Sequence, residues 1–414
     1  MEATHTVCVV GLGYIGLPTA AVIAANGNRV VGVDVNRHHI DEINAGRVPF
    51  VEPDLESVVA GVVAQGRLRA QADVPHADCY IVAVPTPFTD DHDVDPKYIF
   101  AASDAIAPQL TGGELVILES TSPPGLTERM ADHILAARPD LTAEAGKPNS
   151  IYFAHCPERV LPGRIMIEIA DNDRIIGGTT PEGAEKARDL YATFCRGELL
   201  VTDARTAEMA KLTENSFRDV NIAFANELSI ICDRLGIDVW ELIDLANHHP
   251  RVNILQPGPG VGGHCIAVDP WFIVAAAPEE SRLIRLARQV NDFKPEFVLE
   301  KVLAKIARFR DPVIAALGIA FKADIDDLRE SPSKAIVEKL AAEVAHARVL
   351  VAEPNVQELP AALAARDNVE LVSTAEAIRE ADVVLVLVDH TPFKLIDRDQ
   401  LRDKVVIDTK GLFR

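Results

Sequence analysis

The chain has 414 residues, which is enough for two or three domains that each bury a core of their own. Its formal net charge of -21 argues against nucleic acid and anionic membrane surfaces as partners. Its six cysteines are scattered without a CxxC pair, no apolar run approaches the length of a membrane span, and the first residues lead directly into a predicted strand, so we expect a cytoplasmic protein with reduced thiols and no signal peptide.

The N-terminal segment predicts a strand, a tight turn and a helix that together bind a dinucleotide. Val7–Val10 is a short apolar run, the turn reads Gly-Leu-Gly-Tyr-Ile-Gly, and an alanine-rich helical pattern continues through Ala25. The first glycine would form the turn, the second would let the backbone approach a pyrophosphate, and the third would let the helix pack on the strand. The predicted cofactor-binding residues of this turn are Gly11, Gly13, Tyr14, Ile15 and Gly16.

An acidic residue about 20 positions further on completes this pattern. The next predicted strand, Arg29–Val35, carries Asp34, where a carboxylate can accept hydrogen bonds from both ribose hydroxyls of NAD. Its negative charge would repel the 2′-phosphate of NADP, so NAD is the expected cofactor. Arg37 lies nearby and, as a cation, argues in the opposite direction; it is also a predicted cofactor contact.

The rest of the N-terminal half alternates between strands and helices, such as the predicted helix Pro181–Phe194. This alternation predicts a doubly wound α/β sheet, which binds ligands at the carboxyl edge of its strands. Thr86, Thr121 and Thr127 lie in two loops at that edge and are candidate cofactor contacts; the alternative is that both loops are ordinary proline turns. The further strands expected here are Cys79–Val84, Leu115–Leu118, Ile151–Ala154 and Arg174–Ile176.

A long helix is predicted over Arg205–Leu235, where no proline or glycine interrupts an apolar pattern of helical spacing. At 1.5 Å per residue it would be about 45 Å long. A polar stripe on this helix is usually a solvated face, but the remaining surface is so apolar that we expect this one to line a site. We expect the apolar surface itself to form a two-fold homodimer interface. The stripe consists of Glu208, Lys211, Asn215 and Arg218 or Asp219.

The segment Pro257–Pro270 places one thiol behind four glycines and two prolines. Glycine has no Cβ to block a ligand, so a cysteine presented by such a loop is a candidate nucleophile. Asp269, four residues after Cys265, could orient that thiol or a water molecule, and the backbone N–H groups could receive a developing oxyanion. The alternative is a tight turn that contains an incidental buried cysteine.

The last third of the chain restarts the alternation of strands and helices and predicts a second Rossmann-like sheet without the dinucleotide glycines. The loop after its first strand carries Lys322 and Arg329, and Lys410 follows its last strand. Three cations at one carboxyl edge predict a nucleotide that lacks nicotinamide as the ligand. The expected strands are Val313–Leu317, Arg348–Val351, Val369–Val372, Asp382–Val388 and Val405–Ile407.

These motifs together resemble those of the nucleotide-sugar 6-dehydrogenases, the UDP-glucose/GDP-mannose dehydrogenase family, over essentially the whole chain. The matching motifs, in order, are the glycine turn, Val84-Pro-Thr-Pro, Glu119-Ser-Thr, Lys211 with Asn215, the Gly-Gly-His-Cys loop and Phe321-Lys with Arg329-Glu-Ser-Pro. UDP-glucose members typically carry Ser, Phe and Lys where this chain has His264, Ile266 and Val268, which disfavours glucose as the sugar. These positions, with Cys156–Gly163 and Lys211–Val220, resemble members that act on UDP-N-acetylmannosamine.

The resemblance implies a four-electron oxidation of the sugar C6 alcohol to a carboxylate with two NAD, giving a precursor for surface polysaccharide. Cys265 would form a thiohemiacetal and then a thioester, which water hydrolyses with Glu158 as the candidate base. Lys211 would stabilise the C6 oxygen or exchange a proton with it, Asn215 would act as a neutral donor, and Asp269 would hold Cys265 and water in place. Arg329 would lie toward the cofactor. The implied substrate contacts are Arg159, Val160, Lys211, Asn215, Arg218, His249, Arg251, Gly262, Phe321 and Lys322, to which we add Lys410.

The expected fold is therefore α/β, with two Rossmann-like, doubly wound parallel-sheet domains joined by a long central helix and a helical middle domain. It comprises an NAD-binding domain over residues 1–204, a central helical and dimerisation domain with the Cys265 loop over 205–300, and a UDP-sugar-binding domain over 301–414.

Four alternatives stay open at this point. The same chemistry could act on UDP-N-acetylglucosamine or another UDP-hexosamine, the protein could be a one-step hydroxyacid dehydrogenase, which has no use for Cys265, or it could be a non-enzymatic nucleotide sensor. His155, Cys156, His264 and Cys265 could also bind zinc. Adjacent residues seldom both reach one ion, so no metal is expected.

Overall fold

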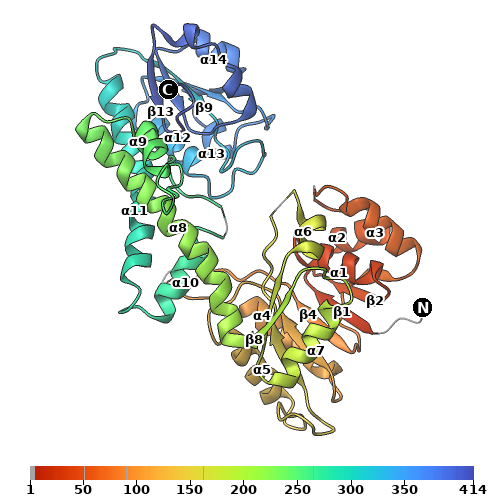
Figure 1. The fold of residues 1–414 in the computed structure, drawn as a ribbon. Helices are drawn as coiled ribbons and strands as arrows, with labels where there is room; N and C mark the ends of the chain where they lie inside the picture. The colour runs from red at the N-terminus through yellow and green to blue at the C-terminus, as the bar shows by residue number, and fades with distance from the viewer. Residues whose placement is uncertain (1–4, 51, 90–91, 162, 264) are drawn as a thin grey trace. The chain divides into compact units, whose positions relative to one another are not determined.

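The computed structural model describes residues 5–50, 52–89, 92–161, 163–263 and 265–414 (Figure 1). The chain folds as two compact units, Met1–Glu214 and Asn215–Arg414, here called unit 1 and unit 2. The predicted three-domain division, with boundaries after residues 204 and 300, is finer and stays a prediction; its middle part contributes residues to both units. No helix among the described residues has the length and apolar character that a membrane crossing needs.

Unit 1 contains the doubly wound sheet that the sequence predicts. Its eight strands lie in the order β3-β2-β1-β4-β5-β6-β7-β8, and neighbours run parallel except for β6 and β7, which are antiparallel. The strand order reverses between β1 and β4, which is where sheets of this kind bind ligands. The strands are β1 (Thr6–Val10), β2 (Arg29–Val33), β3 (Leu68–Gln71), β4 (Cys79–Val82), β5 (Leu115–Leu118), β6 (Tyr152–His155), β7 (Arg174–Gly178) and β8 (Leu199–Asp203).

Strands β3 and β8 were not predicted from the sequence. Both lie at the edges of the sheet, and an edge strand need not be apolar on both faces. Arg69 in β3 is exposed, and Leu200 and Val201 in β8 are 42% and 43% exposed. The predicted helix Pro181–Phe194 is present but ends at Tyr191.

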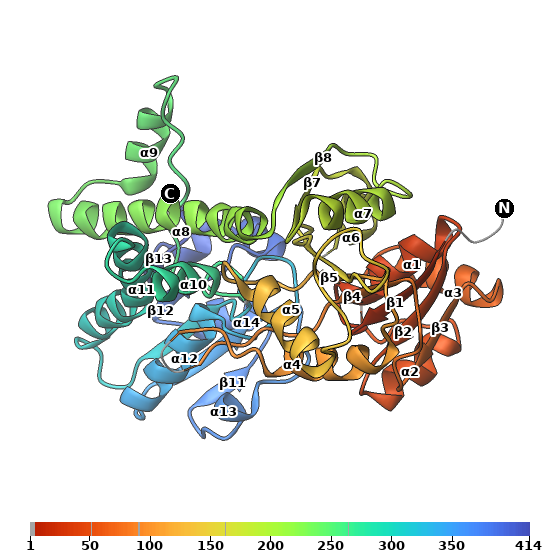
Figure 2. The ribbon, with the colours of Figure 1, turned by 90° about the horizontal axis from the view of Figure 1, so that it is seen from below.

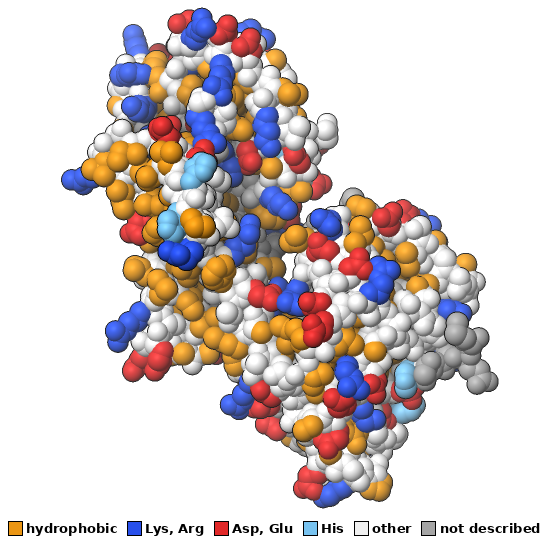
Figure 3. All heavy atoms as spheres, in the orientation of Figure 1, with side chains coloured by type: hydrophobic (Ala, Val, Ile, Leu, Met, Phe, Trp, Pro, Cys, Tyr) orange, Lys and Arg blue, Asp and Glu red, His pale blue; other side chains and the backbone are white. Residues whose placement is uncertain are grey.

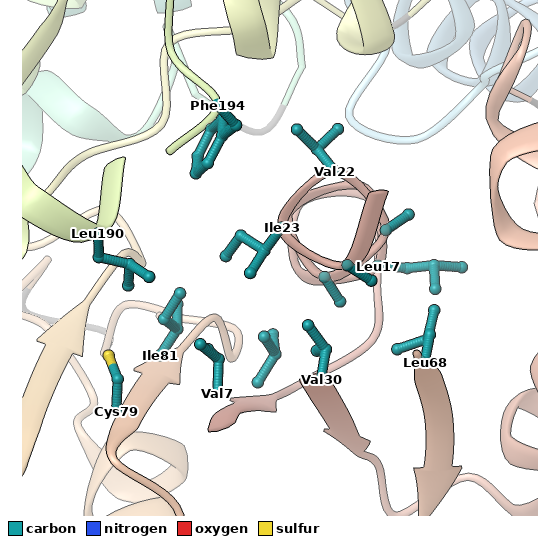
Figure 4. Close-up of a cluster of buried hydrophobic side chains, with 14 of the residues drawn as sticks. Val7, Leu17, Val22, Ile23, Val30, Leu68, Cys79, Ile81, Leu190 and Phe194 are labelled. Carbon is teal, nitrogen blue, oxygen red and sulfur yellow. The ribbon is translucent and has the colours of Figure 1, made fainter. Parts of the chain in front are cut away.

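The helices of unit 1 pack on a sheet whose strands are almost completely buried. Figure 4 shows Ile23 of α1 on the side of Val7 and Ile81, and Leu17 on the side of Leu68. Every residue of α1 from Gly16 to Ala24 is buried, as expected for a helix that is apolar on all sides. The helices are α1 (Gly16–Ala25), α2 (Arg37–Asn44), α3 (Leu55–Ala64), α4 (Lys97–Ile106), α5 (Leu126–Ala137), α6 (Ile165–Asp171) and α7 (Pro181–Tyr191), with the short 3-10 helix η1 (Ala107–Gln109).

Helix α8 (Ala204–Leu235) is the long helix that the sequence predicts, and it begins one residue earlier than expected. It belongs to unit 1 up to Glu214 and to unit 2 from Asn215 onward. Figure 2 shows it as one unbroken helix.

Unit 2 contains a five-stranded parallel sheet in the order β11-β10-β9-β12-β13, with helices on both faces. Alternate residues of its strands point to opposite faces, so Ile314 and Ala315 belong to different hydrophobic clusters. The strands are β9 (Val313–Leu317), β10 (Arg348–Ala352), β11 (Val369–Leu371), β12 (Val383–Val386) and β13 (Val405–Asp408). The other helices are α9 (Val239–Asn247), α10 (Asp269–Ala276), α11 (Arg282–Ile306), α12 (Pro332–Glu343), α13 (Ala361–Ala364) and α14 (Thr374–Glu380), with η2 (Thr391–Leu395) and η3 (Arg398–Leu401).

The two sheets share the same turn after their first strand. In unit 1, Gly11 has φ 97° and Leu12 N donates to the carboxylate of Asp34 at 2.9 Å. In unit 2, Gly318 has φ 87° and Ile319 N donates to the carboxylate of Glu353 at 2.8 Å. Unit 2 therefore keeps the glycine turn and the acid of a dinucleotide fold, although the sequence pattern lacks the remaining glycines.

The carboxylate of Glu353 in unit 2 is hydrogen-bonded to the buried imidazole of His390. His390 Nδ1 accepts from Asp324 N at 2.9 Å, so the ring proton lies on Nε2, which donates to Glu353 Oε2 at 3.0 Å. Glu353 also accepts from Ala320 N and from two nitrogens of Asn355. With five donors around it, counting that from Ile319, this carboxylate has no acceptor capacity left.

Candidate active site

The glycine turn of unit 1 has the shape that a bound dinucleotide requires. A Cβ at Gly11 would lie 2.5 Å from the carbonyl oxygen of Ala83, and one at Gly16 would lie 1.8 Å from the carbonyl oxygen of Gly11. These two glycines are therefore required by the fold itself. A Cβ at Gly13 would meet no atom within 4 Å, so the backbone there faces open space that a ligand can enter. Tyr14 is 44% exposed beside it.

Asp34 is half-buried at the end of β2. One carboxylate oxygen accepts from Leu12 N at 2.9 Å and the other from Asn36 N at 2.8 Å. Each oxygen thus has one hydrogen bond and can accept another, which a ribose diol needs. Arg37 is exposed at the start of α2, and Ile15 is half-buried next to α1.

The three candidate threonines at the carboxyl edge differ in their surroundings. Thr86 and Thr121 are half-buried in the loops that follow β4 and β5. Thr127 is fully buried, and its hydroxyl donates to Glu208 at 2.6 Å, so it has no proton left to donate to a cofactor. Glu208 also accepts from the backbone N–H groups of Gly125 and Thr127, and it therefore caps the start of α5.

The predicted polar stripe of α8 separates into residues with different roles. Glu208 is used as a cap, and Asp219 is buried and accepts from Arg288 at 2.6 Å, so neither is available to a ligand. Lys211 and Asn215 are half-buried between them, one turn apart. Among the described residues no side-chain hydrogen bond or ion pair involves the amino group of Lys211, so this group can reach a ligand.

Cys265 is exposed, so the alternative of an incidental buried cysteine is wrong. Its backbone carbonyl accepts from Val268 N at 3.0 Å and Asp269 N at 2.8 Å, which forms the turn into α10. Asp269 is 2% exposed, and its carboxylate accepts from Asn215 Nδ2 at 2.5 Å. Asp269 therefore hydrogen-bonds both to the backbone of Cys265 and to the side chain of Asn215, the predicted amide donor.

Burial makes most of the other cysteines unreactive. Four are buried, and Cys195 is half-buried. Burial raises the pKa of Cys8 to about 12, and burial together with the charge of Glu119 does the same for Cys156 despite the opposing effect of Arg174. A thiol with so high a pKa forms almost no thiolate.

The Cys265 loop packs against the loop that follows β9. A Cβ at Gly262 would lie 2.4 Å from the carbonyl oxygen of Glu330, and one at Gly263 would lie 3.2 Å from the ring of Phe321. The amino group of Lys410 would lie 3.9 Å from a Cβ at Gly258. Unit 2 therefore brings the Cys265 loop together with two other predicted substrate contacts, Phe321 and Lys410.

The other basic residues of unit 2 that the sequence assigns to ligand binding lie on exposed positions. Lys322 is exposed, and Arg329 is exposed with its guanidinium on Asp327 at 2.7 Å. Arg218, His249 and Arg251 are also exposed. The roles assigned to these residues from the sequence stay predictions.

Glu158 follows β6 and accepts two hydrogen bonds. Its Oε2 accepts from Arg174 Nη2 at 2.9 Å, and its Oε1 accepts from Arg159 N at 2.7 Å. The guanidinium of Arg159 donates to Glu214 at 2.6 Å and to the carbonyl oxygen of Asp173. The neighbouring Val160 packs against the hydrophobic core. Sequence patterns gave no sign of Arg174, because it reads as an ordinary residue of a strand.

Comparison with known proteins connects this geometry to one family along the whole chain. Three family models match in order: the NAD binding domain of the UDP-glucose/GDP-mannose dehydrogenase family over residues 5–195, its central domain over 205–293 and its UDP binding domain over 315–414. The chain belongs to the UDP-glucose/GDP-mannose dehydrogenase family. The family and the enzyme class expected from the sequence are confirmed, so a one-step hydroxyacid dehydrogenase and a non-enzymatic sensor are excluded.

Relatives of this nucleotide-sugar dehydrogenase carry two different sugar names. An NDP-N-acetyl-D-galactosaminuronic acid dehydrogenase from Ralstonia nicotianae is 58% identical, covering 99% of this chain and 96% of the relative. A UDP-N-acetyl-D-mannosamine dehydrogenase from Escherichia coli K12 is 54% identical over 99% of both chains. The solved structure of the UDP-N-acetyl-mannosamine dehydrogenase Cap5O from Staphylococcus aureus matches with a TM-score of 0.85 at 41% identity, covering 99% of this chain and 96% of that one.

NAD is the cofactor of this dehydrogenase family, and unit 1 fits it. Gly13 leaves room for the pyrophosphate, and Asp34 keeps acceptor capacity for the ribose. A metal is not part of that fit: the described residues contain no group of three or more His, Cys, Asp or Glu placed to hold an ion. His264, one of the four ligands weighed for zinc, lies outside the described residues.

Replacing Asp34 by alanine should weaken NAD binding and reduce the preference for NAD over NADP. Two hydrogen bonds from the ribose to a charged acceptor would be lost, so we expect kcat/KM for NAD to fall about 10- to 100-fold. The value for NADP should change much less, because its 2′-phosphate no longer meets a carboxylate. Asp41→Ala, at an exposed position on α2, is the matched control. Equal kcat/KM for the two cofactors in the unmodified enzyme would contradict the assignment.

Proposed function

We propose that the enzyme oxidises the C6 alcohol of UDP-N-acetylmannosamine to the carboxylate and so supplies UDP-N-acetylmannosaminuronate as a precursor for surface polysaccharide. The observation that carries this proposal is the exposed thiol of Cys265 in a glycine loop packed against Phe321, within the unit that carries the UDP binding domain. The relatives named for this activity support the choice of sugar, since they match over nearly the full chain.

In the first step the C6 alcohol becomes an aldehyde. NAD supplies the chemistry of hydride acceptance when it is bound. The C6 hydroxyl releases its proton to water, and the half-buried Lys211 of α8 stabilises the C6 oxygen as negative charge develops on it. Asn215 donates a further hydrogen bond through Nδ2, in an orientation set by its contact with Asp269.

In the second step Cys265 adds to the aldehyde. The new bond joins Sγ to C6, the thiol proton passes to the carbonyl oxygen, and the product is a thiohemiacetal. This adduct gives up a hydride from C6 and the proton from its hydroxyl to become a thioester. A thiol is required because an aldehyde is a poor hydride donor until a nucleophile has added to it.

In the third step water hydrolyses the thioester. Glu158 accepts a proton from the attacking water, the bond between C6 and Sγ breaks, and the sulfur regains a proton. The balance is one alcohol, two NAD⁺ and one water giving one carboxylic acid, two NADH and two protons. The reduced thiol that this scheme requires agrees with the proposed cytoplasmic location.

The diphosphate needs cations, because the chain as a whole carries a net charge of -21. We assign this role to Lys322 and Lys410 at the edge of the second sheet, with Arg218, His249 and Arg251 as further substrate contacts. Lys410 also contacts Asp389 at 3.1 Å, which holds its amino group beside the Cys265 loop.

A second candidate substrate is the UDP-linked N-acetylgalactosamine. The observation that favours it is the relative from Ralstonia nicotianae, which has higher identity than the mannosamine enzymes and carries the galactosaminuronic name. The two sugars differ at C2 and C4, so they place the acetamido group and one hydroxyl differently while presenting the same C6 alcohol.

A panel of UDP-sugars tests the proposed substrate. The kcat/KM for NADH formation should be highest with UDP-N-acetylmannosamine and at least about 100-fold lower with UDP-glucose. A site built to hydrogen-bond the acetamido group is left with unpaired polar groups when the sugar lacks that group. UDP-N-acetylgalactosamine and UDP-N-acetylglucosamine complete the panel. A galactosamine derivative turned over best would transfer the assignment to the second candidate, and glucose turned over equally well would reject both.

The exposed apolar stripe of α8 leads us to propose a homodimer. Phe217, Phe224 and Ile231 recur every seven residues on one helical face and are 70%, 50% and 46% exposed. Figure 3 shows hydrophobic side chains gathered on this side of unit 2, over α8 and α10.

Light scattering tests the proposed homodimer. The measured mass should be twice that of the chain, and Phe224→Glu should lower the measured mass toward that of the monomer. Arg282→Gln, at an exposed position on α11, should have no such effect. A fully active monomer would contradict the proposal.

A further inference from the structure

A buried cluster of charges lies in unit 1 behind Glu158. Arg174, at the start of β7, contacts Glu158 at 2.9 Å and Glu119 at 3.7 Å. Glu119 follows β5 and also accepts from the hydroxyls of Thr19 and Tyr191, each at 3.2 Å. The side chains of Arg174, Glu119 and Glu158 are 4%, 0% and 8% exposed.

A buried cluster of charges is weak evidence of a role in fold stability. Burying charges has a desolvation cost, and a buried ion pair can often be replaced by apolar residues without loss of stability. Here two carboxylates share one guanidinium, so the cluster is not even neutral when both are ionised. An arrangement of this kind at the carboxyl edge of a nucleotide-binding sheet indicates a functional reason for its position.

The contacts leave Glu158 able to act as a base. Each of its oxygens accepts one hydrogen bond, from Arg174 or from the backbone of Arg159, and each can accept one more. The hydrogen bond from Arg174 holds one carboxylate oxygen in a fixed place, which leaves a defined direction for an attacking water. Glu119 fixes Arg174 from the other side, and the rings of Tyr191 and Phe194 cover its guanidinium.

We propose that Arg174 and Glu119 are positioning residues for Glu158, which orient its carboxylate for hydrolysis of the thioester. This inference rests on the proposed function, because Glu158 is the base in that scheme. It assigns no contact with substrate to either residue. Their effect should therefore be confined to the hydrolytic step.

The hydrolytic step should also depend on pH through Glu119. Burial and the charge of Glu158 together raise its pKa to about 7, against the opposing effect of Arg174. When Glu119 loses its proton as the pH rises through this value, its negative charge pairs with Arg174 and fixes the guanidinium that orients Glu158, so hydrolysis should become faster. The other titratable groups facing Glu119 are Cys79, Cys156 and Tyr191, whose pKa values are all raised, so they remain neutral over this range.

The experiment separates hydrolysis from the preceding oxidations by rapid quenching and mass measurement of the acylated Cys265. Arg174→Lys keeps the charge but not the planar fork, and Glu119→Gln keeps the shape but not the charge. In both variants hydrolysis should be about 10- to 100-fold slower, and the thioester should accumulate. The rate of the first oxidation and the KM values for NAD and for the UDP-sugar should change less than about threefold. Glu119→Gln should in addition lose the rise in rate near pH 7.

Glu114→Gln is the matched control. Glu114 is also buried, but it lies at the amino end of β5, where it accepts from Thr111 and Gly112. Its replacement can lower stability but should leave hydrolysis unchanged. Glu158→Gln is the reference, because it should accumulate the thioester whether or not Arg174 matters.

The outcomes are distinct. If Glu158→Gln accumulates the thioester but Arg174→Lys and Glu119→Gln hydrolyse it at the unmodified rate, the positioning role is overturned and the proposed function stands. If Glu158→Gln does not slow hydrolysis, the role of Glu158 is wrong and the inference is rejected with it. Should Arg174→Lys not fold, Glu119→Gln decides the question alone through its rate and its pH profile.

Discussion

Replacing Cys265 by alanine should abolish formation of the uronic acid. The unmodified enzyme should release two NADH for each sugar consumed, because both oxidations take place at C6. The alanine variant has no nucleophile to add to the aldehyde, so it should release at most one NADH per sugar and no acid. NADH measured by absorbance together with product analysis by mass spectrometry gives both quantities.

A control for this experiment is available within the same chain. Cys195→Ala changes a half-buried cysteine whose thiol donates to the carbonyl oxygen of Asn172, and it should retain full acid production. A melting curve should show that Cys265→Ala folds normally, because the thiol that it removes is exposed. Uronic acid formed at the normal rate by this variant would reject the covalent mechanism.

Replacing Asp269 by alanine should have the next largest effect. Alanine keeps the backbone N–H that donates to the carbonyl of Cys265 but removes the buried carboxylate that accepts from Asn215 Nδ2, so the amide donor loses the contact that orients it. We expect kcat to fall about 100- to 1,000-fold, the size of effect seen when one preorganised donor is lost. Asp269→Asn keeps an acceptor for Asn215 and should lose less.

The measurement is a single turnover that follows the second NADH. Asp244→Asn is the control, because Asp244 is exposed on α9 and its ion pair with Arg414 at the surface contributes little. A similar KM for the UDP-sugar in Asp269→Ala would indicate that binding is intact and that the chemical steps are affected. Activity of Asp269→Ala within a few-fold of normal would contradict this role.

The parts of the fold that were predicted correctly are those with a local signal. The turn from Gly11 to Gly16 and the acid Asp34 lie within one strand-helix-strand segment, and each strand predicted from an apolar run is present. The sequence did not predict β3 and β8, because these edge strands lack a continuous apolar run. The antiparallel direction of β7 escaped because no residue within the strand encodes the direction of its neighbour.

The site shows the same division. Cys265 and Lys211 were found from the loop or the helix that carries them. The cap that Glu208 provides for Thr127 joins residues 81 positions apart, and the contact of Asn215 with Asp269 joins residues 54 positions apart. Such pairs exist only once the chain has folded, so spacing along the sequence cannot indicate them. Arg174 is the clearest case, because its meaning comes entirely from Glu119 and Glu158.

The hydrogen bond between His390 and Glu353 in the second sheet has a consequence for the kinetics of the enzyme. Glu353 already holds His390 and the turn at Ile319, whereas its counterpart Asp34 keeps room for a ribose diol. A dinucleotide that enters unit 2 therefore finds no acceptor for its ribose, although the turn there has the same form. High concentrations of NAD should not compete with the sugar nucleotide, so the enzyme can work at saturating cofactor without substrate inhibition from that side.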